Sequence, residues 1–429
     1  MGIYLNSYKP LVNYKNLYRS KYFVDKSLII EKLNEVIETS DKYICVTRPR
    51  RFGKSSVADM LGAYYSKAVD SKEIFDNLKI REAESYEENL NKYNVINISF
   101  NTIPDNNKTY DEYMSIIQNG LIDDIKGMYP DLEIKDYYTI SHMLNATKDK
   151  FVFIFDEWDY IFSNKLFEEK QNDFLEFIRQ LLKDQPYVAL AYMTGVLPIK
   201  KYSSGSALNM FDEYTFLKDR IYDEFFGFTN NEVLNLCKRT NEIEFKELEN
   251  WYNGYLTSKG NKIYNPRSVV KALQNGYCES YWTNTGAMDE VAKYLKYNIL
   301  EIRDDVIEMV SGEEIDIFID EEFRAGQREP RTKEEIYSAM IVLGFLSYHD
   351  GYLKIPNKEL MKEFEEALRV CDKTFIVELK KDESVDVALK QIREKEYVQK
   401  FKKENNEVLA VAICYDSKLK EHRCKIESI

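Results

Sequence analysis

The residues best suited to chemistry form the run RPRRFGKS at positions 48–55. An apolar run precedes it and a segment with helical character follows it. A strand, a tight turn ending in Gly-Lys-Ser and a helix together hold nucleoside triphosphates, because backbone N–H groups and the helix N-terminus face the phosphates. Lys54 is expected to reach the β- and γ-phosphate oxygens, and Ser55 to ligate Mg²⁺. The full pattern has glycine at the position of Arg48, so the match is partial.

A second chemical signal is the acidic pair Asp156-Glu157. It ends the apolar run FVFIF at residues 151–155, which predicts a strand buried on both faces. Ligands of open α/β sheets bind at the C-terminal ends of such strands. We expect Asp156 to help hold Mg²⁺ and Glu157 to act as the general base on an attacking water. Taken alone, Gly-Lys-Ser fits a helix N-cap and Asp156-Glu157 fits a strand-end turn equally well. Taken together, in this order along the chain and each on the expected element, the two motifs favour an ATP site.

Predicted strands and helices alternate through the N-terminal half of the chain. Strands are expected at residues 43–47, 95–100, 151–155 and 187–194. This alternation implies an α/β fold with a parallel sheet and right-handed crossovers. One strand separates the phosphate-loop unit from the acidic strand, and another follows the acidic strand. In ATPases with this layout, the polar residue ending the last strand senses the γ-phosphate. Thr194 is the candidate, although an ordinary strand-end threonine also fits.

The chain becomes mainly helical between residues 209 and 355, which suits a lid over a nucleotide site. Helical patterns occupy residues 231–239, 269–274, 288–295 and 332–343. Pro266-Arg267 opens one of these helices, and helix capping alone accounts for both residue types there. In a lid, Arg267 would instead reach the nucleotide, and the sequence leaves both readings open.

Bulk properties narrow the class of protein. With 429 residues, 44% hydrophobic and 31% charged, the chain has room for two or three domains and a sizeable core. The net charge of −13 disfavours a purely electrostatic nucleic-acid binder. Six scattered cysteines and three isolated histidines disfavour disulfide, metal-centre and histidine-triad chemistry. No secretory or membrane-spanning stretch is evident, so we expect a cytoplasmic protein without a membrane partner.

The last segment changes character again. Residues 375–380 predict a strand whose period of two places Glu378 and Lys380 on one side. A helix is expected at 384–401, carrying Gln391, and closing strands at 408–412 and 423–426. A solvated strand face explains a lone Glu-x-Lys pair equally well.

In combination, these motifs resemble the bacterial AAA-ATPase-like proteins, which often carry a C-terminal PD-(D/E)XK nuclease-like domain. The resemblance covers residues 1–275 and rests on YFVDKS (22–27), RPRRFGKS (48–55), FDEWD (155–159), TGVLPIK (194–200), FFGFT (225–229), WYNGY (251–255) and YNPRS (264–268). Members of this family have arginine in place of the first glycine, so Arg48 is a family trait.

The resemblance implies a P-loop NTPase fold of the α/β class, with a parallel sheet and helices on both of its faces. The implied divisions are an ATPase core (1–208), a helical, winged-helix-like lid (209–370) and a small nuclease-like segment (371–429). It implies ATP and Mg²⁺ as ligands. The implied nucleotide-binding residues are Arg50, Arg51, Phe52, Gly53, Lys54, Ser55 and Ser56. The implied metal ligands are Ser55 and Asp156, and the implied catalytic residues are Glu157, Lys54, Thr194 and Arg267.

The nuclease-like segment matches only half of the family pattern. Such nucleases take an aspartate from one strand, Glu-x-Lys from the next and often a glutamine from the following helix, and the acids hold Mg²⁺. Glu378, Lys380 and Gln391 fit the second half. Residues 364–374 are too few for a helix, a hairpin and the missing aspartate, and Asp372 lies too close to the same strand. We therefore expect a truncated, inactive remnant.

The sequence thus predicts an ATPase that couples binding and hydrolysis of Mg-ATP to a conformational change of a helical lid. Two alternatives stay open. One is a nucleotide-dependent binding or regulatory module with little hydrolysis, which recruits a protein partner or nucleic acid. The other is a Mg²⁺-dependent DNA nuclease acting through Glu378 and Lys380. Assembly into a homo-oligomer is a further open expectation.

Overall fold

The computed structural model describes residues 2–102, 109–135, 138–199, 207–281, 295, 301–319, 332–371, 373–394, 407–417 and 421–428. The chain divides into two compact units, Met1–Trp282 with Asp316–Lys358 and Thr283–Ile315 with Glu359–Ile429. The expected three-part division at residues 208 and 370 stays a prediction. No helix in the described part of the chain has both the length and the apolar character needed to cross a bilayer.

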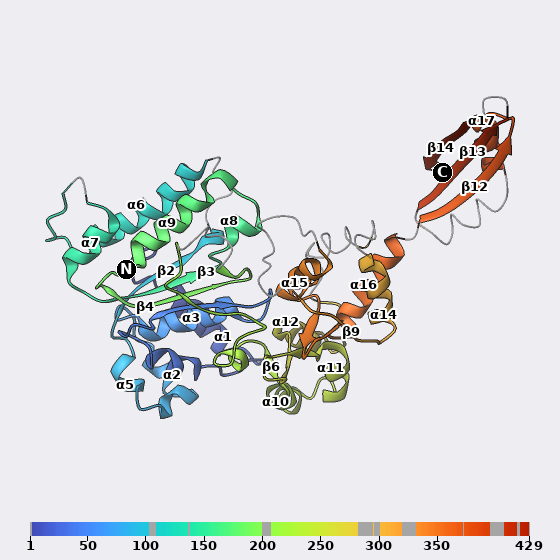
Figure 1. Cartoon of the computed structure of the whole chain (residues 1–429). Coiled ribbons are helices and arrows are strands. Elements are labelled where there is room, and N and C mark those ends of the chain that lie inside the picture. The colour runs from blue at the N-terminus through green and yellow to red at the C-terminus, as the bar shows by residue number, and fades with distance from the viewer. Residues whose placement is uncertain are drawn as a thin grey trace. The chain divides into compact units, whose positions relative to one another are not determined.

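The first unit is built on a five-stranded parallel sheet of order β2-β3-β4-β1-β5 (Figure 1). Its strands are β1 (Tyr43–Thr47), β2 (Asn94–Ser99), β3 (Phe151–Asp156), β4 (Val188–Gly195) and β5 (Asp212–Tyr214). The four predicted strands and their parallel pairing are confirmed, whereas the short strand β5 was not predicted. The register pairs Thr47 with Gly195 and Asp156 with Thr194, so the carboxyl ends of β1, β3 and β4 lie side by side.

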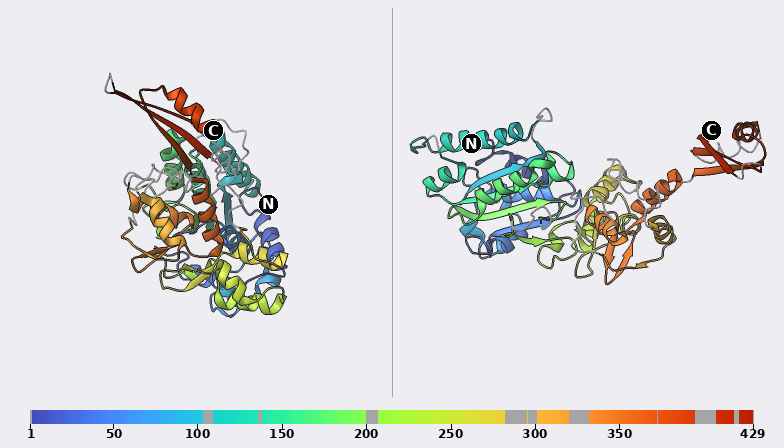
Figure 2. Two further views of the ribbon diagram at one scale, coloured as in Figure 1. Left: turned by 90° about the vertical axis from the view of Figure 1, so that its right-hand side faces the viewer. Right: turned by 45° about the horizontal axis from the view of Figure 1, so that its top comes forward.

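Helices cover both faces of this sheet, as expected for a P-loop NTPase fold (Figures 1 and 2). Helices α1 and α3 lie on one face, with α2 and α5 beside them, and α6, α7 and α9 lie on the other. The helices of this region are α1 (Lys9–Tyr18), α2 (Ile29–Asn34), α3 (Lys54–Tyr65), α4 (Lys72–Phe75), α5 (Tyr86–Asn89), α6 (Tyr110–Met128), α7 (Ile140–Thr147), α8 (Tyr160–Ser163) and α9 (Gln171–Leu182).

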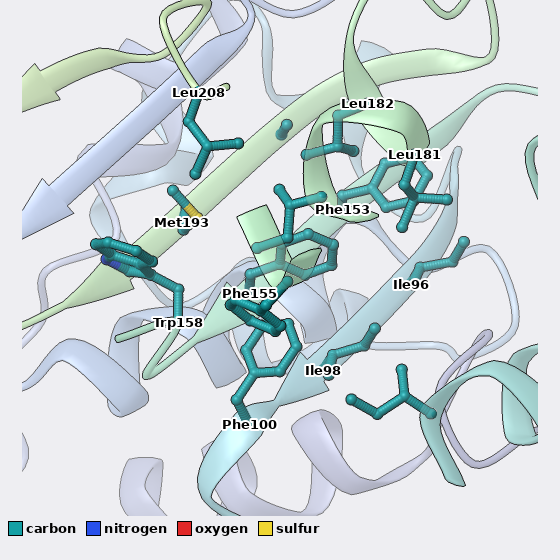
Figure 3. Packing of buried hydrophobic residues seen from close by; sticks show 14 of the residues in the cluster. Ile96, Ile98, Phe100, Phe153, Phe155, Trp158, Leu181, Leu182, Met193 and Leu208 are labelled. Carbon is teal, nitrogen blue, oxygen red and sulfur yellow. The ribbon is translucent and has the colours of Figure 1, made fainter. Parts of the chain in front are cut away.

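An aromatic core holds β3 in place (Figure 3). Phe153 and Phe155 project from β3 into a cluster with Phe100 and Trp158. The ring centroids of Phe100 and Phe155 are 5.5 Å apart in an edge-to-face arrangement. Burying one such side chain contributes about 1.5–3 kcal/mol. This packing fixes the strand that ends in the acidic pair, because β3 is buried along its whole length.

A smaller, mainly helical part follows the sheet in the first unit. Helices α10 (Asn230–Thr240), α11 (Phe245–Tyr252) and α12 (Pro266–Asn275) share a hydrophobic core. Beside them, the antiparallel sheet β6-β8-β7 is formed by Phe228–Thr229, Lys262–Tyr264 and Tyr255–Leu256. Farther along the chain come α15 (Lys333–Leu343) and the sheet β10-β11-β9, formed by Ser347–His349, Tyr352–Lys354 and Ile315–Asp316.

Three of the four helices expected here are present as α10, α12 and α15. The helix expected at 288–295 falls outside the described residues except for residue 295. The small sheets were not predicted, because strands of two or three residues are too short to show an alternating pattern.

The second unit contains a three-stranded sheet of order β12-β13-β14. Strand β12 (Lys373–Lys381) is parallel to β13 (Glu407–Asp416), which is antiparallel to β14 (Glu421–Ser428). The helices in the described residues of this unit are α14 (Ile302–Val310), α17 (Val385–Glu394) and all but the first residue of α16 (Lys358–Cys371). A small core of Ala388, Leu389 and Ile392 on α17 packs against Ala410 and Ala412 on β13.

Candidate nucleotide-binding site

The loop between β1 and α3 is a short turn that leads directly into a helix. Arg51 and Gly53 both adopt left-handed conformations, with φ of 69° and 93°. Gly53 is the N-cap of α3, which begins at Lys54. Nothing lies within 4 Å of a Cβ built on Gly53, so the backbone conformation, not the space, calls for glycine here. Successive N–H groups in such a turn and the helix N-terminus favour a bound phosphate.

Arg48, which replaces the first glycine of the usual pattern, is a buried anchor. Its side chain is 1% exposed and forms an ion pair with the buried carboxylate of Asp219. The guanidinium also donates to the carbonyls of Thr47 (2.8 Å) and Tyr214 (3.0 Å). The ring of Phe226 lies 4.9 Å from the guanidinium carbon. Arg48 therefore fastens the start of the loop to residues 214–226 and does not face the phosphate side.

Phe52 anchors the other end of the loop. Its buried ring makes edge-to-face contacts with Phe216 and Tyr255, at centroid distances of 5.8 and 5.1 Å. Its carbonyl accepts a 3.0 Å hydrogen bond from the N–H of Gly227. The contact that Phe52 can offer a nucleotide is thus its backbone N–H, because its carbonyl and ring are already engaged.

Lys54 lies inside the loop, near three carboxylates. Its buried ammonium donates to the carbonyls of Arg48 and Pro49, both at 3.0 Å. Burial lowers the pKa of Lys54, and the charges of Asp159, Asp156 and Glu157 raise it. The structure therefore brings the loop lysine and the acidic pair together, although more than a hundred residues separate them in the sequence.

Ser55 lies close to Asp156. Burial raises the pKa of the Asp156 carboxyl, and the nearby hydroxyl of the exposed Ser55 lowers it. A hydroxyl and a carboxylate are hard oxygen donors, which fit Mg²⁺. Within the described residues there is no cluster of three or more His, Cys, Asp or Glu arranged for a metal. This is compatible with Mg²⁺, which usually keeps several waters and substrate phosphates as ligands.

Glu157 is held by a residue that the sequence analysis missed. The Asn101 side-chain amide donates a 2.6 Å hydrogen bond to Glu157 Oε2. Asn101 follows the carboxyl end of β2, the strand beside β3. Burial and the charge of Asp156 raise the pKa of Glu157. The signal that could have revealed Asn101 is a polar residue just beyond the strand next to the acidic one.

Asp159 is a second overlooked acid of the site. It is 3% exposed, and its carboxylate accepts hydrogen bonds from the N–H groups of Val196 (3.1 Å) and Leu197 (2.8 Å) and from Ser163 Oγ (3.1 Å). A Cβ on Gly195 would fall 2.3 Å from Asp159 Oδ1, so this close approach requires glycine. Asp159 thereby joins the segments that follow β3 and β4.

Thr194 is fully buried at the end of β4. Its hydroxyl donates a 2.9 Å hydrogen bond to the carbonyl of Val46 on β1. It is not among the residues that line the cavity described next. Its proposed role as a γ-phosphate sensor stays a prediction.

A cavity of about 940 Å³ opens beside the loop. Its lining includes the loop residues from Arg50 to Val57 together with Glu157 and Asp159. Other parts of the lining come from an N-terminal segment, including Phe23 and Val24, and from α12. A cavity of this size accommodates a ligand as large as a nucleotide.

Arg267 lines this cavity from the first turn of α12. The cap of that helix is a different residue, because Asn265 Oδ1 accepts from the N–H groups of Arg267 (3.0 Å) and Ser268 (3.4 Å). The exposed Arg267 side chain is therefore placed to meet a ligand.

The N-terminal part of the chain is similar to a known protein family. Residues 11–204 match a family model described as "Predicted AAA-ATPase". These residues are similar to that family, and residues 11–204 are called the AAA-ATPase-like region below. The AAA-ATPase-like region includes the phosphate loop, Asp156-Glu157 and Thr194. A Walker-type ATPase of Pyrococcus abyssi is distantly similar in structure, with a TM-score of 0.39 and 14% identity over 79% of this chain and 94% of that one. No curated protein matches the chain.

The nuclease-like residues lie outside the AAA-ATPase-like region. Lys380 Nζ is 3.9 Å from carboxylate oxygens of both Glu378 and Glu383, which places Glu378 and Lys380 on one side of β12. Gln391 lies on α17 and is partly exposed. Helix α16 ends at Cys371, and β12 begins at Lys373. The expectation of an inactive remnant stays a prediction.

Proposed function

We propose that the chain binds Mg-ATP in the cavity and hydrolyses it to ADP and phosphate. The observation that carries this proposal is the convergence of Lys54, Ser55, Asp156 and Glu157 at the carboxyl ends of β1 and β3, beside a cavity of nucleotide size. The match of residues 11–204 to the AAA-ATPase model supports it independently.

The chemistry assigned to these residues is an in-line displacement. As the water oxygen attacks the γ-phosphorus, Glu157 takes the proton of the water. The bond between the γ-phosphorus and the bridging oxygen breaks, and its electron pair leaves with ADP. Lys54 offsets charge on the β- and γ-phosphates. Ser55 and Asp156 would hold Mg²⁺, which neutralises phosphate charge when bound.

Nucleotide binding is proposed to act on the helical region through the loop itself. Arg48 contacts residues between 214 and 226, while Phe52 contacts Phe216, Gly227 and Tyr255. A shift of the loop on phosphate binding therefore has to be accommodated by the segment that leads into α10–α12. These contacts give the expected lid movement a physical route.

We expect Glu157→Gln to reduce kcat for ATP by about 10²–10⁴-fold, because the amide cannot accept the water proton. ATP affinity should change little, since the base contacts the water rather than the phosphates. Phosphate release and equilibrium binding of a fluorescent ATP analogue measure the two quantities, with Glu176→Gln on the exposed side of α9 as the matched control. Wild-type protein that binds ATP and releases no phosphate would instead support the binding-module alternative.

Asn101→Ala is expected to lower kcat by about 10–100-fold while leaving the melting temperature close to that of wild type. The hydrogen bond to the ionised Glu157 is charge-assisted, and such bonds contribute about 1.5–3 kcal/mol. Single-turnover phosphate release measures the effect. Asn145→Ala, which removes an exposed amide bonded to Gln185, is the control. A kcat equal to that of wild type would show that Asn101 does not position the base.

A further inference from the structure

The three arginines of the phosphate loop have different surroundings. Arg48 is buried against Asp219, and Phe52 is buried against Phe216 and Tyr255. Between these two anchors, Arg50 and Arg51 both line the cavity. Arg50 is exposed, whereas Arg51 is partly buried in its left-handed conformation. The backbone on either side of Arg50 is thus held by side-chain packing, while Arg50 itself is exposed and lines the cavity.

Arg50 shares the cavity with the groups assigned to the chemistry. It lines the cavity together with Lys54, whose ammonium is assigned to the β- and γ-phosphates. Glu157, assigned to the attacking water, lines the same cavity. The γ-phosphate of a bound nucleotide would lie among these groups.

We propose that Arg50 is a catalytic residue that acts in cis, stabilising the charge on the transferring γ-phosphoryl group, so that hydrolysis needs no second copy of the chain. The proposal rests on the proposed ATPase function. Negative charge in this transition state spreads over the three equatorial oxygens. A planar guanidinium can donate to two of them at once, which an ammonium cannot do with the same geometry. Arg50 transfers no proton, because the proton of the water goes to Glu157.

The position of Arg50 in the loop favours a role in cis. Arg48 and Phe52 both pack against other residues of the same chain, and Arg50 lies two positions from each of them. An arginine donated by a partner has to be brought to the site by assembly, whereas Arg50 is already at the cavity wall. Catalysis should therefore not depend on protein concentration.

The first test compares Arg50→Ala with wild type. An arginine that stabilises the charge of the phosphoryl-transfer transition state raises kcat by about 10³–10⁵-fold. We therefore expect Arg50→Ala to lower kcat by at least about 10³-fold and to reduce ATP affinity by no more than about tenfold. Arg50→Lys should recover only part of the rate, because it keeps the charge and loses the planar fork. Since Arg50 is exposed, its variants should melt at the wild-type temperature. Arg179→Ala, which removes a partly exposed arginine on α9, is the control.

The second test separates cis from trans action. Arg50→Ala and Lys54→Ala proteins are mixed, and wild-type turnover is measured over a dilution series. We expect no recovery in the mixture and a constant turnover per molecule. Recovery on mixing, turnover that falls on dilution, or an Arg50→Ala kcat equal to that of wild type would each overturn the inference. A wild-type protein without turnover would contradict the proposed function, and this inference with it.

Discussion

Replacing Arg48 with glycine, which restores the usual phosphate-loop pattern, is expected to lower the free energy of unfolding by about 3–5 kcal/mol. The loss arises because Asp219 is fully buried and forms an ion pair with Arg48. Without the guanidinium, that carboxylate stays buried with no counter-charge. The carbonyls of Thr47 and Tyr214 lose a donor in the same step.

Two further variants separate charge from volume. Arg48→Met fills most of the space but leaves Asp219 unpaired, so it should be nearly as destabilising as glycine. Adding Asp219→Asn should recover part of the loss, because the amide oxygen can still accept from the N–H groups of Ile221 and Tyr222, 2.8 and 2.7 Å away in the wild type. Urea unfolding followed by far-UV circular dichroism gives the comparison. A glycine variant that unfolds at the wild-type urea concentration would show that Arg48 is no anchor.

Lys54→Ala is expected to weaken ATP binding by about 10–100-fold, because it removes a charge-assisted contact to the β- and γ-phosphates. Turnover should fall with it, since the same charge offsets the charge that develops on the γ-phosphate. Binding is measured by titration calorimetry with Mg-ATP. Lys67→Ala is the matched control, because this lysine is half exposed and its surface pair with Asp149 contributes little.

Lys54→Ala is also expected to be less stable than the wild type, so its stability must be measured together with its activity. The Lys54 ammonium also satisfies the carbonyls of Arg48 and Pro49. We therefore expect a lower melting temperature in Lys54→Ala, and binding should be measured well below that temperature. An ATP affinity equal to that of wild type in the folded variant would contradict the assigned role of Lys54.

Much of the core was predictable because its signals are local. The buried strand β3 is a continuous apolar run, and its acidic ending marks the carboxyl edge of the sheet. Glycine tolerates a left-handed conformation, so Gly53 indicates the turn after which the helix begins at Lys54. The alternation of strands and helices predicts parallel pairing of the strands. In the structure, parallel pairing of β3 with β4 places Asp156 next to Thr194.

The remaining features depend on contacts distant in the sequence. The partner of Arg48 is Asp219, 171 residues away, and no local pattern marks that aspartate as buried. Asn101 acts on Glu157 only because β2 and β3 are neighbours in the sheet. Strand β5 has three residues, too few to show a period. The phosphate loop and the acidic pair could therefore be predicted from residue types and their spacing. The residues that hold them in place, such as Asp219 and Asn101, could be identified only from the folded structure.

The measurement that tests the central claim most directly is Mg²⁺-dependent phosphate release from ATP by the wild-type protein and by Lys54→Ala, both confirmed as folded. We predict turnover in the wild type that is lost when Mg²⁺ is chelated and is strongly reduced in Lys54→Ala. Equal phosphate release by the two proteins would contradict the assignment of the site between the phosphate loop and Asp156-Glu157.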